Sequence, residues 1–407
     1  MGAAPIRIHS APWVVPVSRP MIADGGVGVS GGKIIAVEAL PRLRQLYPHA
    51  EIVDHPASAL TPALINAHIH LELSHLLELS ESRPASFTGW ISRLLQCRDR
   101  LGATGEQAQH AAAQTAEQQY RSGVSVLADI GNTALGREMA DSFPGRLLPF
   151  KEYLGMAERT LEKNLQRLGS EPEEVLCSGH APYSTHPRLL QALKARATSH
   201  GQIFPIHAAE PAAEGEMLRE GRGEMVDFIR ERGFWDGTFV PRGRGGTVEY
   251  LYDLGLIDEH TLCIHGVHVS GEEIDILAGE GAKVCLCPGS NQFLGVGTAP
   301  LRQYLDRGIL PALGTDSLAS NPEVSLWREM ALLAANFMDV DPTIVFAMAT
   351  RGGAEALSLG DLLGTLDSGK EADLLAVQLP GPATEALQVC RYLVSAGPAI
   401  RLARINE

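Results

Sequence analysis

The sequence predicts an α/β protein in which a (β/α)₈ barrel is joined to a small β domain built from both ends of the chain. Two observations support this prediction. Eight short apolar runs, typical of buried strands, alternate with helical stretches through the middle of the chain, and each run ends in polar or ionisable residues. The two ends instead contain short β-rich pieces that glycine and proline interrupt.

The small β domain is expected from the patterns at the two termini. Gly25–Glu38 places apolar residues at every second position, which is the spacing of a strand and not of a helix. Gly369–Pro380 and Tyr392–Ile405 are strand-like as well. Because the two ends of a chain often lie close together in a fold, we expect residues 1–59 and 365–407 to form one small β domain.

Residues 60–364 are predicted to form the barrel. Its eight strand candidates are Leu60–His70, Val124–Asn132, Arg146–Gly155, Glu174–Ser184, Ile203–Glu210, Thr261–Val269, Ala282–Asn291 and Leu310–Ser320. Amphipathic stretches such as Ala108–Gly123 separate them and would cover the outer face of a parallel sheet. The long connection from Glu210 to Thr261 holds the basic stretch Pro241–Gly246, which fits either a surface loop or part of a substrate lid.

Composition and charge restrict the class of protein. Of the 407 residues, 45% are hydrophobic and 20% are charged, as in globular proteins with a large core. The formal net charge of −14 disfavours nucleic-acid binding. The six cysteines form no CxxC pair, which favours a reducing cytoplasm. No run approaches the roughly 18 apolar residues of a membrane helix, so a soluble cytoplasmic protein is expected.

A histidine pair ends the first strand candidate. His68 and His70 are separated by one residue, so their side chains project from the same face, with α-carbons roughly 7 Å apart, and both can reach one metal ion. Alone, such a pair is more often a pair of hydrogen-bonded core histidines than a pair of metal ligands. Other strand candidates end in His180, His207, His265 and Asp316. Because carboxyl ends of barrel strands meet at one mouth, this convergence predicts a metal or catalytic centre.

The strand ends carry several recognisable motifs. They read TPALINAHIHLE, GHAPYS, IHAAE, CIHGVH, CPGSN and GTDS, and LGTLDSGKEADLLAV follows them. Together they resemble the amidohydrolase superfamily, in its cytosine deaminase-like branch with the chlorohydrolases and the deaminases of S-adenosylhomocysteine, methylthioadenosine and aminodeoxyfutalosine. The resemblance implies one divalent metal held by His68, His70, His207 and Asp316, in a barrel joined to a β-sandwich from both chain ends.

The chemistry of these residue types can also be argued directly. Three neutral imidazoles and one carboxylate suit zinc, or iron or manganese less selectively, and they leave a position for water whose pKa falls to about 7. Glu210, three residues after His207, can carry a proton from that water to a ring nitrogen, although a helix cap is the alternative. Asp316 can accept the water proton, and His265 can hold the attacking oxygen.

A second metal would require a bridging lysine that is carboxylated at its amine. Lys151, in the sequence PFKEYLG, is the candidate for this position. Against it, Glu210 resembles the arrangement of the mononuclear deaminases. One metal is therefore expected.

Three features bear on the substrate. Trp90 in SFTGW resembles the segment that covers the base in nucleoside deaminases of this branch, and an aromatic residue there is otherwise core. His180 resembles the residue that hydrogen-bonds the sugar end of the substrate. Arg98, Arg242 and Arg244 could receive a substrate carboxylate, or they are solvated surface charges.

The sequence therefore predicts a metal-dependent hydrolytic deaminase that acts on C–N bonds other than peptide bonds. The expected substrate is a 6-aminopurine nucleoside with a bulky 5′ substituent: aminodeoxyfutalosine of menaquinone biosynthesis, S-adenosylhomocysteine or methylthioadenosine. A chlorohydrolase, a triazine amidohydrolase or a cyclic-amide hydrolase would use the same site. A catalytically dead binding protein without metal is the alternative of another class. The expected partner is the small-molecule substrate, and a homodimer is the default assembly.

Overall fold

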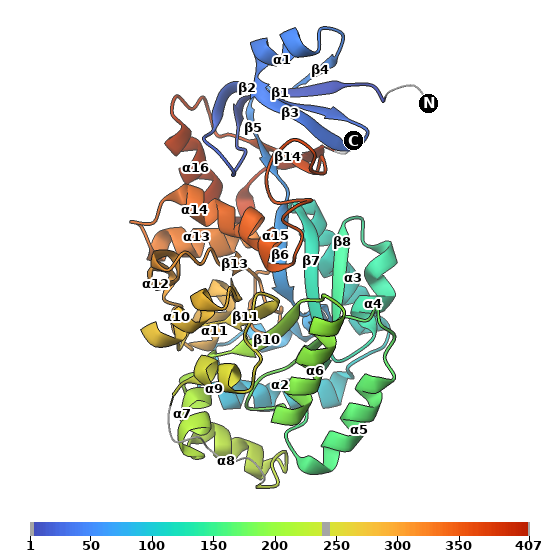
Figure 1. The fold of residues 1–407 in the computed structure, drawn as a ribbon, viewed down its shortest axis with the longest axis vertical. Helices are drawn as coiled ribbons and strands as arrows, with labels where there is room; N and C mark the ends of the chain where they lie inside the picture. Colours follow the sequence, from blue (N-terminus) through green and yellow to red (C-terminus); the bar gives the residue numbers. More distant parts are fainter. Residues whose placement is uncertain (1–3, 238–244, 406–407) are drawn as a thin grey trace. The chain divides into compact units, whose positions relative to one another are not determined.

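The computed structural model describes residues 4–237 and 245–405 (Figure 1). Its strands form two sheets, one with seven strands and one with eight. The chain divides into two compact units, of which the first contains residues 1–67, 118–126 and 325–407 and the second contains residues 68–117 and 127–324. The domain boundaries expected at residues 60 and 364 stay a prediction.

The seven-stranded sheet combines strands from both ends of the chain, as predicted. Its members are β1 (Arg7–Val14), β2 (Ile22–Ser30), β3 (Lys33–Ala39), β4 (Glu51–Asp54), β5 (Ser58–Pro62), β14 (Leu374–Gln378) and β15 (Leu402–Ile405). The order is β15-β14-β5-β1-β2-β3, and β4 also pairs with β1. Strands β2 and β3 form an antiparallel pair joined at Gly31 and Gly32, which both have positive φ angles that glycine adopts without strain.

One predicted strand near the carboxyl terminus was partly wrong. The segment Tyr392–Ile405 begins inside helix α16 (Ala386–Ser395), and only its end forms β15. The buried residues of α16 are Val389, Cys390, Leu393 and Val394. Their spacing places them on one face of a helix, a pattern that becomes visible only when residues before Tyr392 are included.

The eight-stranded sheet contains all eight predicted barrel strands. They are β6 (Leu64–Ile69), β7 (Val124–Gly131), β8 (Arg146–Tyr153), β9 (Cys177–Gly179), β10 (Phe204–Ala208), β11 (Thr261–His265), β12 (Lys283–Leu286) and β13 (Ala312–Leu313). They are neighbours in chain order from β6 to β13. Thr315 and Asp316, just after β13, donate backbone hydrogen bonds to the His68 carbonyl at 3.0 and 3.1 Å. The last strand therefore meets the first, and the barrel is nearly closed.

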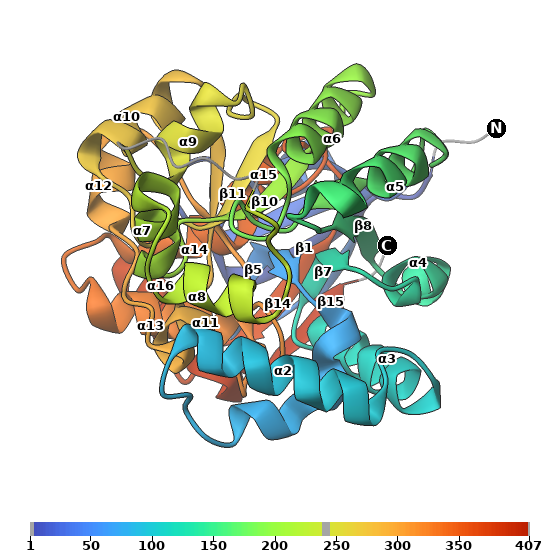
Figure 2. The same cartoon turned by 90° about the horizontal axis from the view of Figure 1, so that it is seen from below.

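Helices follow most of the barrel strands. They include α2 (Phe87–Leu101), α3 (Glu106–Arg121), α5 (Glu158–Gly169), α6 (Pro187–Ser199) and α10 (Gly271–Gly279). Of these, α3 matches the predicted stretch Ala108–Gly123. Figure 2 shows α5 and α6 outside the strands β8 and β10.

The connection between β10 and β11 is largely helical. It contains α7 (Ala212–Glu220), α8 (Glu224–Glu231) and α9 (Thr247–Asp253). Most of the basic stretch Pro241–Gly246, including Arg242 and Arg244, lies outside the described residues, so the expectations for it stay untested. Helices α8 and α2 are neighbours (Figure 2), and the hydroxyl of Thr88 donates to the carboxylate of Glu224 between them.

Across residues 4–237 and 245–405, no helix is both long enough and apolar enough to cross a membrane.

Gly314 follows β13, where the last barrel strand packs against the first. A larger residue at this position tests how tightly the barrel closes. A β-carbon at this position would lie 2.7 Å from His68 Cβ and 2.9 Å from Cys285 Sγ, closer than real contacts allow. We expect Gly314→Ala to lower the free energy of unfolding by about 1–3 kcal/mol, because one of these neighbours must move. Gly279→Ala is the control, since a β-carbon added there would have no neighbour within 4 Å. Thermal unfolding that shifts equally in both variants would contradict the contact.

Candidate metal centre

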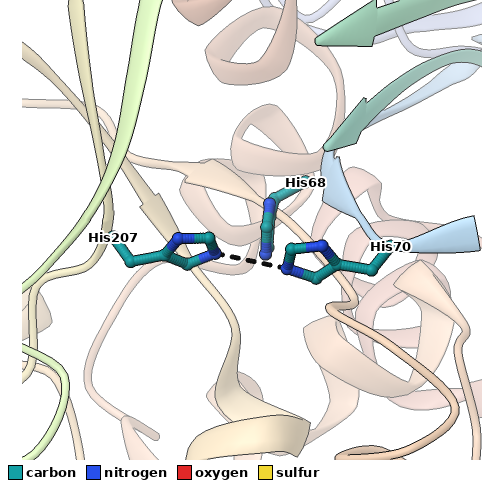
Figure 3. A group of neighbouring side chains, drawn as sticks. All are labelled: His68, His70 and His207. Carbon is teal, nitrogen blue, oxygen red and sulfur yellow. Dashed lines mark hydrogen bonds between the residues drawn. The ribbon is translucent and has the colours of Figure 1, made fainter. Parts of the chain in front are cut away.

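Three histidines meet at the carboxyl ends of β6 and β10. His70 Nδ1 donates a hydrogen bond to the Ile130 carbonyl at 2.7 Å, and His207 Nδ1 donates to the His180 carbonyl at 2.8 Å. A carbonyl only accepts, so the hydrogen of each neutral ring is on Nδ1 and each Nε2 carries a lone pair. These two Nε2 atoms lie 3.2 Å apart, with the His68 ring beside them (Figure 3). Two lone pairs at this distance require a proton or a metal ion between them.

Asp316 provides an oxygen donor to the same cluster. It follows β13, and its Oδ1 lies 3.6 Å from His68 Nε2 and 3.7 Å from His70 Nε2. Its Oδ2 accepts hydrogen bonds from the hydroxyls of Ser290 at 2.6 Å and Ser320 at 2.8 Å. The serines hold one carboxylate oxygen, so the other is directed toward the histidines.

The donor set fits a divalent metal. Donor atoms of His68, His70 and His207 lie within 4.8 Å of one another, and so do those of His68, His265 and Asp316. Nitrogen and carboxylate donors in this number are typical of zinc sites. The predicted ligands His68, His70, His207 and Asp316 are therefore all brought together.

The electrostatics of the cluster hold His68 and Asp316 in the protonation states that bind a metal. Burial lowers the pKa of His68 to about 3, so that its imidazole is neutral at pH 7. Burial would raise the pKa of Asp316, but the contact with His68 and the neighbouring histidines holds this pKa well below its usual value. Burial lowers the pKa of His70, and the carboxylates of Asp316, Glu152 and Glu72 reverse this to a net increase. A metal ion would replace that proton on His70.

Glu210 and His265, the two predicted catalytic residues besides Asp316, lie next to each other. Glu210 comes after β10 and is only 5% exposed, and its Oε1 lies 3.6 Å from His265 Nε2. Burial, followed by the charges of Asp316 and Glu214, raises the pKa of Glu210 well above its usual value. The structure therefore supplies a carboxyl group that retains a proton more readily than an exposed glutamate does.

Backbone strain marks two of these positions. His265 has a φ of 76° and Asp316 a φ of 57°, which is the left-handed region that residues with a β-carbon seldom adopt. His265 Nδ1 donates to Asn291 Oδ1 at 3.0 Å, which fixes the orientation of the ring. The fold thus holds both side chains in directions that a regular strand would not give them.

A cavity of about 280 Å³ opens above the cluster. His70, His207, Glu210, His265 and Asp316 lie at its polar end. Its apolar lining includes Phe87, Trp90, Ile91, Leu94, Leu95, Met156, Phe228, Ile229 and Phe234, from α2, α8 and the segments beside them. Its other polar groups include Glu72, Arg98, Asn132, Glu152, Arg159 and His180. The site is therefore a cavity that has histidines and carboxylates at one end and a largely apolar chamber beside them.

The predicted substrate-contact residues reach this cavity. Trp90 lines it and also packs against the buried core around Leu76, with Nε1 donating to the Ala319 carbonyl at 3.0 Å. Its contact with a substrate base stays a prediction. His180 lines the cavity, and its Nδ1 lies 2.5 Å from Ser184 Oγ. Arg98 lines it too, but its Nη1 is 3.4 Å from Glu72 Oε1, so it is not a solvated surface charge.

Lys151 is not part of the cluster. Its amine forms an ion pair with Glu171 and lies 5.9 Å from the centre of the Tyr153 ring. It lines a neighbouring polar cavity of about 130 Å³ instead of the main one. Because consecutive residues of a strand point to opposite faces, Glu152 enters the main cavity where Lys151 does not. The two-metal alternative thus lacks its bridging lysine.

Sequence reasoning missed several polar residues of the site. Ser290 and Asn291 belong to the motif CPGSN, which was recognised without a role for its individual residues. Asn132 and Glu152 follow or end barrel strands, as the metal ligands do, and this position was the available signal. Arg159, at the start of α5, lines the chamber as well.

The comparison with protein families decides the classification. The family model described as "Amidohydrolase family" matches residues 59–390. The chain belongs to this family. Its 5-methylthioadenosine/S-adenosylhomocysteine deaminase relative from Nitratidesulfovibrio vulgaris strain DP4 is 28% identical over 90% of this chain and 81% of the relative.

Two further relatives of this amidohydrolase are named as deaminases of aminodeoxyfutalosine or aminofutalosine. The aminodeoxyfutalosine deaminase of Nitratiruptor sp. is 28% identical and covers 91% of each chain. The solved aminofutalosine deaminase of Helicobacter pylori, in complex with methylthio-coformycin, is 25% identical, with a TM-score of 0.83 over 98% of this chain and all of that one. The predicted enzyme class, an amidohydrolase-family deaminase with a histidine-rich site, is confirmed.

Removal of a cluster residue tests the metal assignment. We expect His207→Ala and Asp316→Ala to lower the affinity for Zn²⁺ by about 100-fold or more, because each loses a donor that the fold holds in place. His200→Gln removes an exposed histidine that contacts only its own helix end, and its metal content should equal that of the wild type. Elemental analysis after dialysis against a chelator measures the difference. Equal metal retention in all three variants would contradict the assignment.

Proposed function

We propose that the protein hydrolytically deaminates a 6-aminopurine nucleoside with a bulky, largely apolar 5′ substituent, with aminodeoxyfutalosine as the first candidate. The observation that carries this proposal is one cavity that joins a histidine and carboxylate cluster to an aromatic chamber. Relatives named for aminodeoxyfutalosine and for 5-methylthioadenosine/S-adenosylhomocysteine support the purine nucleoside class. Methylthioadenosine and S-adenosylhomocysteine are the other candidates within it.

The metal is proposed to be a single zinc ion held by His68, His70, His207 and Asp316. What supports zinc is the set of three imidazoles and one carboxylate, which iron or manganese would accept with less selectivity. When bound, the ion would act as a Lewis acid that makes water a nucleophile near neutral pH.

The remaining chemistry is proposed for three side chains of this protein. Glu210 delivers a proton to a ring nitrogen of the purine, which its raised pKa favours. His265 holds the attacking oxygen through Nε2, because its Nδ1 hydrogen is already donated to Asn291. Asp316 accepts a proton during the attack, while the serines keep its carboxylate oriented. That proton then passes from Asp316 to the amino group of the purine, which leaves as ammonia.

Recognition of the substrate is proposed for the walls of the cavity. The rings of Phe87 and Trp90 lie 6.0 Å apart and offer a surface for a planar base. His180 is positioned for the sugar. Phe228 and Phe234 line the cavity as well, and the exposed Arg159 could pair with a carboxylate at the far end of the 5′ substituent.

A substrate panel tests the proposal against its alternatives. We expect ammonia release from aminodeoxyfutalosine with a kcat/KM about 10- to 100-fold above that for adenosine, because the apolar chamber buries the added 5′ group. S-adenosylhomocysteine, methylthioadenosine, guanine and a chlorinated triazine complete the panel. Chloride or amine release from the triazine alone would favour the chlorohydrolase or triazine hydrolase alternative. Metal-loaded protein that turns over nothing would favour a binding protein.

Glu210→Gln tests the proton-transfer role. The amide keeps the size of the side chain but cannot transfer the proton, so we expect kcat to fall by about 10²- to 10⁴-fold. Metal content should be unchanged, because Glu210 is not one of the proposed ligands. Glu220→Gln, an exposed change at the end of α7, is the control. A Glu210→Gln variant with wild-type kcat would exclude this role.

A further inference from the structure

Glu152 is a buried cavity residue that the proposed mechanism does not use. It lies near the end of β8, is 6% exposed and lines the main cavity. Its Oε2 accepts a hydrogen bond from Asn132 Nδ2 at 2.6 Å. Its Oε1 is fully buried and has no hydrogen-bond partner among the described residues. Buried carboxylate oxygens are rarely left without a donor, so this atom indicates a ligand group.

The neighbouring His207 does not supply the missing donor. The distance from His207 Nδ1 to Glu152 Oε1 is 3.6 Å, which is too long for a hydrogen bond. The Nδ1 hydrogen is already donated to the His180 carbonyl at 2.8 Å.

A second metal ion at this point is disfavoured by the same contacts. Donor atoms of Glu152, His180 and His207 lie within 4.8 Å of one another, which matches a metal site in distance. However, Nε2 of His207 faces His70 in the candidate metal centre, and its Nδ1 donates to the backbone carbonyl of His180. Only one carboxylate and one imidazole remain, which is too few for a protein-held transition metal.

These two remaining groups suit a pair of hydroxyls. Glu152 Oε1 is an acceptor, and His180 has Nε2 left for a ligand because its Nδ1 contacts Ser184 Oγ. Each hydroxyl of a vicinal diol can donate to one of these atoms. Asn132 Oδ1 in turn accepts a hydrogen bond from Arg98 Nη1 at 3.4 Å. Arg98 and Asn132 therefore hold the carboxylate of Glu152 in place without a ligand.

We propose that Glu152, together with His180, binds the 2′- and 3′-hydroxyls of the substrate ribose, which makes Glu152 a specificity-determining residue for ribonucleosides. This inference rests on the proposed function, since it assigns the sugar of the same nucleoside. It adds a contact that selects ribose over deoxyribose. Hydrogen bonds to a carboxylate of this kind change kcat/KM by about 10- to 100-fold.

The test compares nucleosides that differ only in their hydroxyls. Adenosine, 2′-deoxyadenosine, 3′-deoxyadenosine and 2′,3′-dideoxyadenosine are assayed with the zinc-loaded wild type, Glu152→Gln and Glu162→Gln, an exposed change on α5. For the wild type and the control we expect kcat/KM to fall about 10- to 100-fold from adenosine to the dideoxy compound. For Glu152→Gln we expect kcat/KM for adenosine to fall, and its ratio to that of the dideoxy compound to shrink to about 3- to 10-fold, because only the hydrogen bond to His180 is left.

The other outcomes overturn the inference in different ways. If Glu152→Gln lowers kcat/KM equally for adenosine and the dideoxy compound, Glu152 is a structural residue. If this variant loses zinc, Glu152 acts through His207. Wild-type protein that does not distinguish the four nucleosides would also exclude the contact, even if no variant folds. Wild-type protein that deaminates no nucleoside would instead refute the proposed function itself.

Discussion

The structure of this site depends on two backbone carbonyls. The carbonyls of Ile130 and His180 take the Nδ1 hydrogens of His70 and His207, and this forces both Nε2 lone pairs into one small space. Two nitrogen lone pairs that lie 3.2 Å apart repel each other, so the arrangement is stable only with a cation or a shared proton between them. A metal is therefore favoured by the hydrogen-bond pattern itself, independently of any likeness to other proteins.

The barrel makes this arrangement possible because its strands run parallel. The donors come from the ends of β6, β10 and β13, which are far apart in sequence but close in a nearly closed sheet. The backbone amides of Thr315 and Asp316 bond to the carbonyl of His68, so the last strand places its carboxylate directly against the first histidine. The positive φ of Asp316 then turns its side chain toward the cluster. The contacts that close the barrel therefore also position Asp316 among the donors.

The sequence predicted most of the barrel and the donor residues because both follow from a simple rule, that parallel strands end at one edge. It could not predict contacts that depend on side-chain direction. Lys151 and Glu152 are adjacent, and only the register of β8 determines which one enters the cavity. The roles of Ser290 and Asn291 require the hydrogen-bond geometry after folding. The helix that begins before Tyr392 was missed because a short apolar run fits either a strand or a helix.

In the proposed function, different parts of the cavity carry out the reaction and recognise the substrate. The groups proposed for chemistry lie at the strand ends, on a scaffold that many hydrolytic reactions share. The walls come from α2, α8 and the start of α5, which are outside the sheet and can vary without moving a donor. The polar chain from Arg98 through Asn132 to Glu152 connects these two regions, because it begins on α2 and ends beside His207. We therefore expect substitutions in this row of hydrogen-bonded side chains to change the preference between substrates more than the rate of the chemical step.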